Sequence, residues 1–174
     1  MINNTFYLLE QVGAMGGKRP SVKSKTEDEE QYSLENAAWY KEKVGSMYQA
    51  QKEIYLAHWD VLNRHLTTVD KNELQYEKKG TLLSLESGRL IKTRFSGFIE
   101  EFAELYQTHK PLTVIDAKLR TVLQNDVRNV FLPRYKNFFE KYARIQFSKK
   151  NQDQYLKYPP AKVDALIADL YETL

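Results

Sequence analysis

Apolar residues recur at steps of three and four positions along most of the chain, which is the spacing of one face of an α-helix. The pattern covers the stretches 33–66, 84–108 and 116–143 and is most regular in the last. No stretch alternates apolar and polar residues in the way of a half-buried strand. The sequence therefore predicts an all-α protein, an antiparallel helical bundle in which each helix buries one stripe. In 116–143 the stripe comprises Leu119, Val122, Leu123, Val127, Val130, Phe131, Tyr135, Phe138 and Tyr142.

Polar and helix-breaking residues separate the predicted helices. Loops are expected over 13–30, which ends in an acidic run, and over 69–80. Residues 1–10 resemble the tail of a helix that stops at Gly13, and 161–174 form a final amphipathic segment, which makes five helices. The 174 residues fit a single domain, and the abrupt start leads us to expect a fragment of a longer protein.

Prolines and one aspartate mark the ends of these helices. Pro111 is expected to end the third helix, since proline disfavours helical geometry at the residue before it. Asp116 is a good N-cap for the fourth helix, and Pro133 should kink that helix. Pro160 suits the first turn of the last helix, where a missing N–H costs nothing.

Composition places the chain among globular proteins, with 42% hydrophobic and 28% charged residues. There is no cysteine, which excludes disulfides and thiolate metal sites and is typical of a cytosolic protein. No apolar run approaches the roughly 20 residues that span a bilayer. Trp39 and Trp59 lie at helical spacing and are expected in the core or at a helix seam.

The sequence offers no convincing catalytic or metal-binding group. His58 and His65 share one helix face about 10 Å apart along the axis, too far to hold one zinc ion together. The glycine-rich run at 13–20 lacks the Ser or Thr that follows the lysine of a phosphate loop. No Ser or Thr nucleophile has a partnered His and acid. We therefore predict no enzyme activity, no catalytic residue, no metal and no cofactor.

Positive charge gathers in the last third of the chain. Residues 1–109 hold 14 Lys and Arg against 16 Asp and Glu, whereas residues 110–174 hold 12 against 7. This asymmetry indicates contact with an anionic partner. Within 134–162 the basic residues are Arg134, Lys136, Lys141, Arg144, Lys149, Lys150, Lys157 and Lys162.

Three interpretations of this basic stretch stay open on the residues themselves. Basic residues interleaved with aromatics such as Phe147, Tyr155 and Tyr158 fit an anionic lipid surface or a nucleic-acid backbone equally well. Against nucleic acid, the stretch is short and no known nucleic-acid module is visible. In the third interpretation the charges form a solvated surface, and the bundle is purely structural.

Several segments resemble the C-terminal portion of the seventy-kilodalton exocyst subunit, here called the Exo-seventy family. They cover nearly the whole chain in order, although no single motif is decisive. These segments are Met1-Ile-Asn-Asn-Thr-Phe-Tyr-Leu-Leu, Arg94-Phe-Ser-Gly-Phe-Ile-Glu-Glu-Phe, Val114-Ile-Asp-Ala-Lys-Leu-Arg, Phe131-Leu-Pro-Arg-Tyr-Lys-Asn-Phe and Tyr155-Leu-Lys-Tyr-Pro.

The resemblance implies the elongated end of a rod of stacked helical bundles, in a non-catalytic subunit that helps tether secretory vesicles at the plasma membrane. It implies binding to phosphatidylinositol 4,5-bisphosphate, to other exocyst subunits and to a Rho-family GTPase, with a cytoplasmic, peripheral location at the membrane. The family's lipid-binding pattern Lys-Tyr-Ile-Lys-Tyr matches here at Lys157, whereas Gln154 replaces the first lysine. From local charge we add Lys149, Lys150, Arg144 and Lys162 to the candidate lipid-binding residues.

Overall fold

The computed structural model describes residues 2–15, 27–69, 74–77 and 82–172. These residues fall into two compact units, Met1–Tyr55 (unit 1) and Leu56–Leu174 (unit 2), and each is described by itself. Regular structure in the described ranges is helical and includes no strand, which confirms the predicted all-α fold. The single domain expected from chain length stays a prediction.

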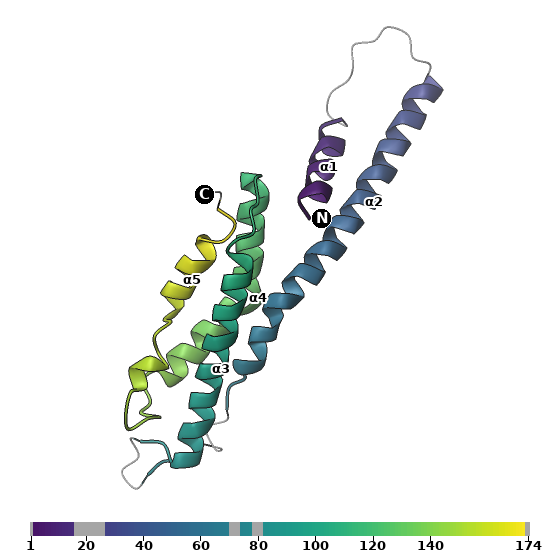
Figure 1. Cartoon of the computed structure of the whole chain (residues 1–174). Coiled ribbons are helices and arrows are strands. Elements are labelled where there is room, and N and C mark those ends of the chain that lie inside the picture. The colour runs from purple at the N-terminus through teal and green to yellow at the C-terminus, as the bar shows by residue number, and fades with distance from the viewer. Residues whose placement is uncertain (1, 16–26, 70–73, 78–81, 173–174) are drawn as a thin grey trace. The chain divides into compact units, whose positions relative to one another are not determined.

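Unit 1 pairs α1 (Ile2–Met15) with most of α2 (Glu27–Asp60), and the two helices run antiparallel (Figure 1). Thr5 Oγ1 donates a hydrogen bond to Gln51 Oε1 over 3.0 Å. The rings of Phe6 and Tyr48 lie 5.7 Å apart. These contacts join the two helices across the inner face of the pair.

The loop predicted over 13–30 is wrong at both ends. Helix α1 continues through Gly13 to Met15, and α2 begins at Glu27, so the acidic run opens a helix; residues 16–26 lie outside the described ranges. Carboxylates are favourable in the first turn of a helix because the macrodipole is positive there. Residues 27–30 include no apolar side chain, so hydrophobic periodicity could not show that they belong to a helix and not to a loop.

The two tryptophans have opposite environments. Trp59 is fully buried, as predicted, whereas Trp39 is 56% exposed, so its expected place in a core or seam is wrong for the described structure. Helical spacing identified the helix but not which of its faces is covered.

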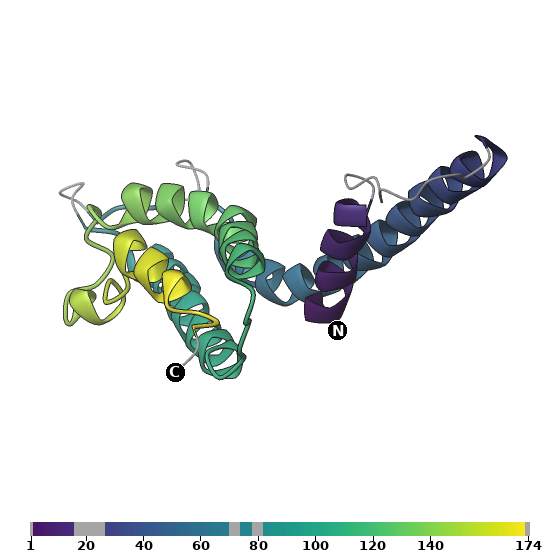
Figure 2. The ribbon, with the colours of Figure 1, turned by 90° about the horizontal axis from the view of Figure 1, so that it is seen from above.

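Unit 2 contains the end of α2, the short 3-10 helix η1 (Val61–His65), α3 (Leu85–His109), α4 (Ala117–Tyr142), the 3-10 turn η3 (Gln152–Gln154) and α5 (Pro160–Ala168). Helices α3 and α4 run antiparallel, and α5 returns along α4 (Figure 1). Asp116 caps α4 as predicted, because its Oδ1 accepts from the N–H of Leu119 over 2.8 Å. Helix α4 changes direction part-way along in both views (Figures 1 and 2), as expected for a helix with Pro133 in its interior.

Aromatic side chains fill the centre of unit 2. Phe98 and Tyr135 stack with their rings 3.9 Å apart, and Trp59 stacks on Phe131 at 6.2 Å. Such offset contacts strengthen a core beyond the area that they bury. The fully buried residues of unit 2 include Trp59, Leu62, Ile91, Phe95, Phe98, Leu119, Val127, Phe131, Tyr135, Phe138, Tyr142, Val163, Ile167 and Leu170.

The last helix is shorter than predicted. Helix α5 ends at Ala168 instead of continuing to residue 174, and Tyr171 has a φ of 64°, in the left-handed region that interrupts a helix. Within the predicted loop 69–80, Tyr76 makes an isolated β-bridge with Leu83. Residues 70–73, 78–81 and 173–174 lie outside the described ranges.

Candidate functional site

The candidate basic residues lie on or beside the segment between α4 and α5, residues 144–159, here called the connector. The side chain of Gln152 makes three hydrogen bonds to the backbone of the connector's first turn, and Ser148 Oγ adds one to the carbonyl of Lys150 over 2.6 Å. Gln152 Oε1 accepts from the N–H groups of Phe147 (3.2 Å) and Ser148 (3.3 Å), and its Nε2 donates to the carbonyl of Ile145 (3.2 Å). Asn151 adopts a left-handed φ of 55°. Lys149 and Lys150 therefore lie on a turn whose backbone is fixed by the protein itself.

The start of the connector is also anchored to unit 2. The ring of Phe147, 2% exposed, stacks on that of Phe95 at 5.4 Å. The N–H of Leu83 donates to the carbonyl of Gln146 over 3.0 Å, which ties the connector to the chain before α3. The turn that carries the two lysines is consequently part of the packed structure.

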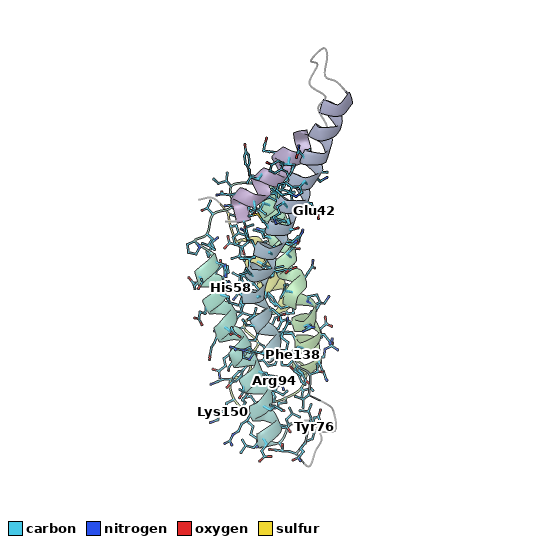
Figure 3. The ribbon with its side chains drawn as sticks, turned by 90° about the vertical axis from the view of Figure 1, so that its right-hand side faces the viewer. Glu42, His58, Tyr76, Arg94, Phe138 and Lys150 are labelled. Atoms are coloured by element: carbon cyan, nitrogen blue, oxygen red, sulfur yellow. The ribbon has the colours of Figure 1, made fainter. Side chains whose placement is uncertain are left out.

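An acidic residue stands beside this turn. Lys149 Nζ lies 3.0 Å from Glu77 Oε1, and the two side chains are 69% and 47% exposed. The N–H of Glu77 donates to the carbonyl of Leu82 over 2.8 Å, which holds Glu77 close to the connector. Figure 3 shows Lys150 and Tyr76 toward the same end of unit 2.

The second half of the connector and the start of α5 gather two further lysines on one ring. Lys157 Nζ lies 5.3 Å and Lys162 Nζ 4.7 Å from the centroid of the Tyr158 ring. Ammonium groups are attracted to the face of an aromatic ring. The hydroxyl of buried Tyr135 donates to the carbonyl of Tyr158, which fixes the backbone at this position. Burial raises the pKa of Tyr135, so its hydroxyl keeps the proton that it donates.

A shallow hollow of about 320 Å³ lies next to Lys157, between α3 and the connector. It is lined by one aliphatic side chain and by polar and charged groups of both signs, including Gln154. The lining residues are Ser96, Ile99, Glu100, Gln154, Tyr155 and Lys157.

Ion pairs fix α5, which follows the connector. Arg128 Nε lies 2.5 Å from Asp164 Oδ1, and Lys110 Nζ lies 2.6 Å from Asp169 Oδ1. Hydrogen bonds from Lys110 and from Tyr106 lower the pKa of Asp169. The connector is therefore bounded by two helices that are both packed into unit 2.

The structure places the five predicted residues in two groups and one isolated position. Lys157 and Lys162 converge on Tyr158, and Lys149 and Lys150 share the turn held by Gln152. Arg144 is exposed at the start of the connector. All five are solvent-exposed, so each is accessible to a partner in solution.

Two features are absent from the described ranges. No group of three or more His, Cys, Asp and Glu in them could hold a metal ion. Among the same residues, no helix is long and apolar enough to cross a membrane. The arrangement offers exposed ammonium groups on a fixed backbone, which can bind anionic groups by charge and hydrogen bonding.

Three residues that matter for this site were missed by sequence reasoning. Gln152 and Tyr135 act on the connector backbone, and Glu77 pairs with Lys149 from a segment about 70 positions earlier in the chain. Gln152 and Glu77 belong to no hydrophobic stripe, basic cluster or motif that would have drawn attention to them. Tyr135 was assigned to the core stripe, which is correct, but its hydroxyl bond to the connector is a tertiary contact.

Comparison with known proteins identifies relatives of this chain. The family model for the C-terminal region of Exo70, a subunit of the exocyst complex, matches residues 1–169. Exocyst complex component exo70 of Schizosaccharomyces pombe is 26% identical over 130 residues, which are 75% of this chain and 20% of the relative. Exocyst complex component EXO70A1 of Arabidopsis thaliana is 35% identical over 96 residues, 51% of this chain and 15% of the relative.

A third relative extends the comparison to another fungus. Exocyst complex protein EXO70 of Yarrowia lipolytica is 35% identical over 92 residues, 53% of this chain and 15% of the relative. The chain thus spans a fifth or less of the length of these relatives. The match over 1–169 confirms the resemblance found in the sequence, and the chain belongs to the Exo70 family, in its C-terminal region.

Proposed function

We propose that this chain is the C-terminal part of an exocyst subunit that helps tether secretory vesicles, and that its connector binds phosphatidylinositol 4,5-bisphosphate at the plasma membrane. Its relatives are named as exocyst components, which supports the tethering role. The role is one of binding, without catalysis. The protein acts from the cytoplasm as a peripheral component at sites of secretion.

The convergence of Lys157 and Lys162 on Tyr158 is the observation that carries the lipid proposal. Two ammonium groups that lie close to one anchored ring form a local positive centre, which would attract a phosphate group. Lys149, Lys150 and Arg144 add charge along the same connector. Gln154, which stands where the family pattern has lysine, leaves the hollow beside Lys157 with one cation fewer.

The affinity of one such surface is low. Each Lys or Arg near an anionic membrane contributes about 1 kcal/mol. Five residues together give about 5 kcal/mol, which corresponds to a Kd of about 0.2 mM. Useful membrane binding then depends on a multivalent headgroup or on several copies held in one assembly, which an exocyst complex would provide.

Other exocyst subunits and a Rho-family GTPase are the protein partners that we propose on the strength of family membership. Because the chain covers a fifth or less of the three relatives described above, these contacts are assigned to the full-length protein. Binding of the purified chain to other exocyst subunits, with and without a GTP-loaded Rho protein, tests whether this portion is sufficient.

Co-sedimentation with vesicles tests the lipid proposal. Wild type is expected to bind vesicles with phosphatidylinositol 4,5-bisphosphate more than vesicles without it, and to release them as salt rises. The variant Lys149→Glu, Lys150→Glu, Lys157→Glu should lose that binding. A matched control carries Lys41→Glu, Lys43→Glu and Lys52→Glu in α2. It changes the net charge by the same amount and should keep most of the vesicle binding.

The same assay tests the competing classes. If duplex DNA displaces the protein from vesicles and binds more tightly, the surface is a nucleic-acid site and the lipid proposal is wrong. If the connector variant and wild type bind equally, the connector is a solvated surface and the membrane contact lies elsewhere.

A further inference from the structure

In the basic turn at Lys149 and Lys150, Lys149 forms an ion pair with the carboxylate of Glu77. Glu77 Oε1 lies 3.0 Å from Lys149 Nζ, at the distance of a charge-assisted hydrogen bond. A carboxylate oxygen and a phosphate oxygen compete for the same ammonium donors. In the free protein, Glu77 thus engages one of the three N–H donors of Lys149 and partly neutralises its charge.

This arrangement is built by the backbone. Glu77 N donates to the carbonyl of Leu82, and Leu83 N donates to the carbonyl of Gln146 in the connector, at 2.8 and 3.0 Å. The N–H of Gln75 donates to Ser87 Oγ in the first turn of α3 over 3.0 Å. The segment that carries Glu77 is therefore attached both to the connector and to α3, and its carboxylate is delivered to Lys149.

The two lysines at the opposite end of the connector have an aromatic ring as their neighbour instead of a carboxylate. Lys157 and Lys162 lie against the ring of Tyr158, and within the described ranges neither forms an ion pair with a carboxylate. The ring attracts the ammonium groups but does not neutralise their charge. An anion arriving from solution therefore meets two different surfaces: Lys157 shares a hollow with Glu100 but forms no ion pair within the described ranges, whereas Lys149 is paired with Glu77.

We propose that Glu77 is an internal competitor that restrains anionic lipid binding at Lys149, so that Lys157 and Lys162 engage the headgroup first. The inference rests on the lipid-binding function proposed above and adds its regulation. A second phosphate, or a membrane with a high density of anionic lipid, displaces Glu77 from Lys149. Binding then rises more steeply with lipid charge density than it would with five independent basic residues.

Vesicle binding of a charge-neutralising variant tests this competition. Glu77→Gln is expected to raise the apparent affinity for vesicles with phosphatidylinositol 4,5-bisphosphate about two- to fivefold at low salt, the range of an exposed ion pair. The gain should disappear near 1 M salt, where the Debye length falls to about 3 Å. Circular dichroism verifies that the variants keep their helices.

Loss of any negative charge favours binding to an anionic membrane, so a matched control is needed. Glu86, exposed in the first turn of α3, has the same side chain and is changed to Gln to measure this general effect. Glu77→Gln should exceed Glu86→Gln in wild type. In a Lys149→Gln background, where there is no ammonium group to release, the two changes should have equal effects.

Each outcome decides the inference. Equal gains from Glu77→Gln and Glu86→Gln in wild type, or an undiminished Glu77→Gln gain in the Lys149→Gln background, overturn the competition while leaving the lipid function intact. Binding by Glu77→Gln but not by wild type supports strong restraint. If neither protein binds any vesicle, the proposed lipid function and the competition are both wrong.

Discussion

The imidazole ring of His65 occupies the space that a Cβ atom would take at position 97, where the chain has glycine. His65 Nε2 lies 2.9 Å from Glu101 Oε2, and Arg64 also contacts that carboxylate. The absence of a side chain at Gly97 lets the ring lie against α3, one turn before Glu101. This relationship joins η1 to α3 inside unit 2.

Gly97→Ala should destabilise the protein although it improves helix propensity by about 1 kcal/mol. The added methyl displaces the His65 ring and breaks its hydrogen bond to Glu101, so we expect a net loss of about 1–2 kcal/mol in the free energy of unfolding. In a His65→Ala background the clash is absent, and the same change should stabilise by up to about 1 kcal/mol. Urea denaturation of the four proteins measures both effects.

A second glycine on a helix provides the control. A Cβ at Gly45 in α2 would meet Leu9 Cδ1 at 3.9 Å, an ordinary van der Waals distance. Gly45→Ala should therefore stabilise by about 0.5–1 kcal/mol. Equal destabilisation by Gly97→Ala in both backgrounds would contradict the steric role of His65.

Gly88→Ala should lower the free energy of unfolding more than Gly97→Ala does, because the added methyl group would meet a backbone atom and not a side chain. A Cβ at position 88 would lie 2.7 Å from the carbonyl oxygen of Phe147, which cannot rotate away. Either α3 or the start of the connector must move, at a cost of about 2 kcal/mol. Thermal unfolding measures the loss, and an unchanged Tm would show that the connector adapts freely.

Gln152→Ala tests the support of the basic turn. The change removes the partner of the Phe147 and Ser148 N–H groups and of the Ile145 carbonyl, and leaving such groups unpaired costs about 1–3 kcal/mol. Exposed Gln154 supplies the matched control, and Gln154→Ala should change stability by less than about 0.5 kcal/mol. Similar stability losses in the two variants would show that Gln152 does not hold the turn.

Stability should fall at mildly acid pH because of His109. Burial, and then the nearby charge of His58, lower the pKa of His109 from its ordinary value of 6.5. Below pH 6.5 the unfolded chain protonates His109 more readily than the folded protein does. The free energy of unfolding is therefore at its full value above that pH and falls as the pH drops below it. His109→Gln should reduce the difference between urea midpoints measured at about pH 8 and about pH 5. A difference as large as that of wild type would assign the pH dependence to other groups.

Helical periodicity predicted most of the fold because it depends on neighbours within a few positions. Seven of the nine residues predicted for the stripe of α4 are buried, whereas Val122 is 37% exposed and Val130 is half-buried, so the stripe is narrower than predicted. The Asp116 cap is local chemistry that a short motif reveals. Helix ends were less well predicted. Gly13 and the acidic run at 27–30 are both compatible with helix, and their neighbours in the sequence did not distinguish the two states.

The candidate site was predicted in its charges but not in its arrangement. Counting Lys and Arg found the connector, because charge density is a property of the sequence itself. It did not find that Lys157 and Lys162 share Tyr158, nor that Lys149 pairs with Glu77. Those partners are set by how segments distant in the chain pack.

The helices and the charge of the connector could be predicted from the sequence, because each depends on residues within a few positions, and the order of motifs indicated the resemblance to the Exo70 family. Which charges are neutralised and which backbone turns are held depends on contacts in the folded protein. Glu77 reaches Lys149, and Tyr135 reaches the Tyr158 carbonyl, through contacts between separate elements. Electrostatic and hydrogen-bond energies depend on distances of a few ångströms, and folding sets those distances.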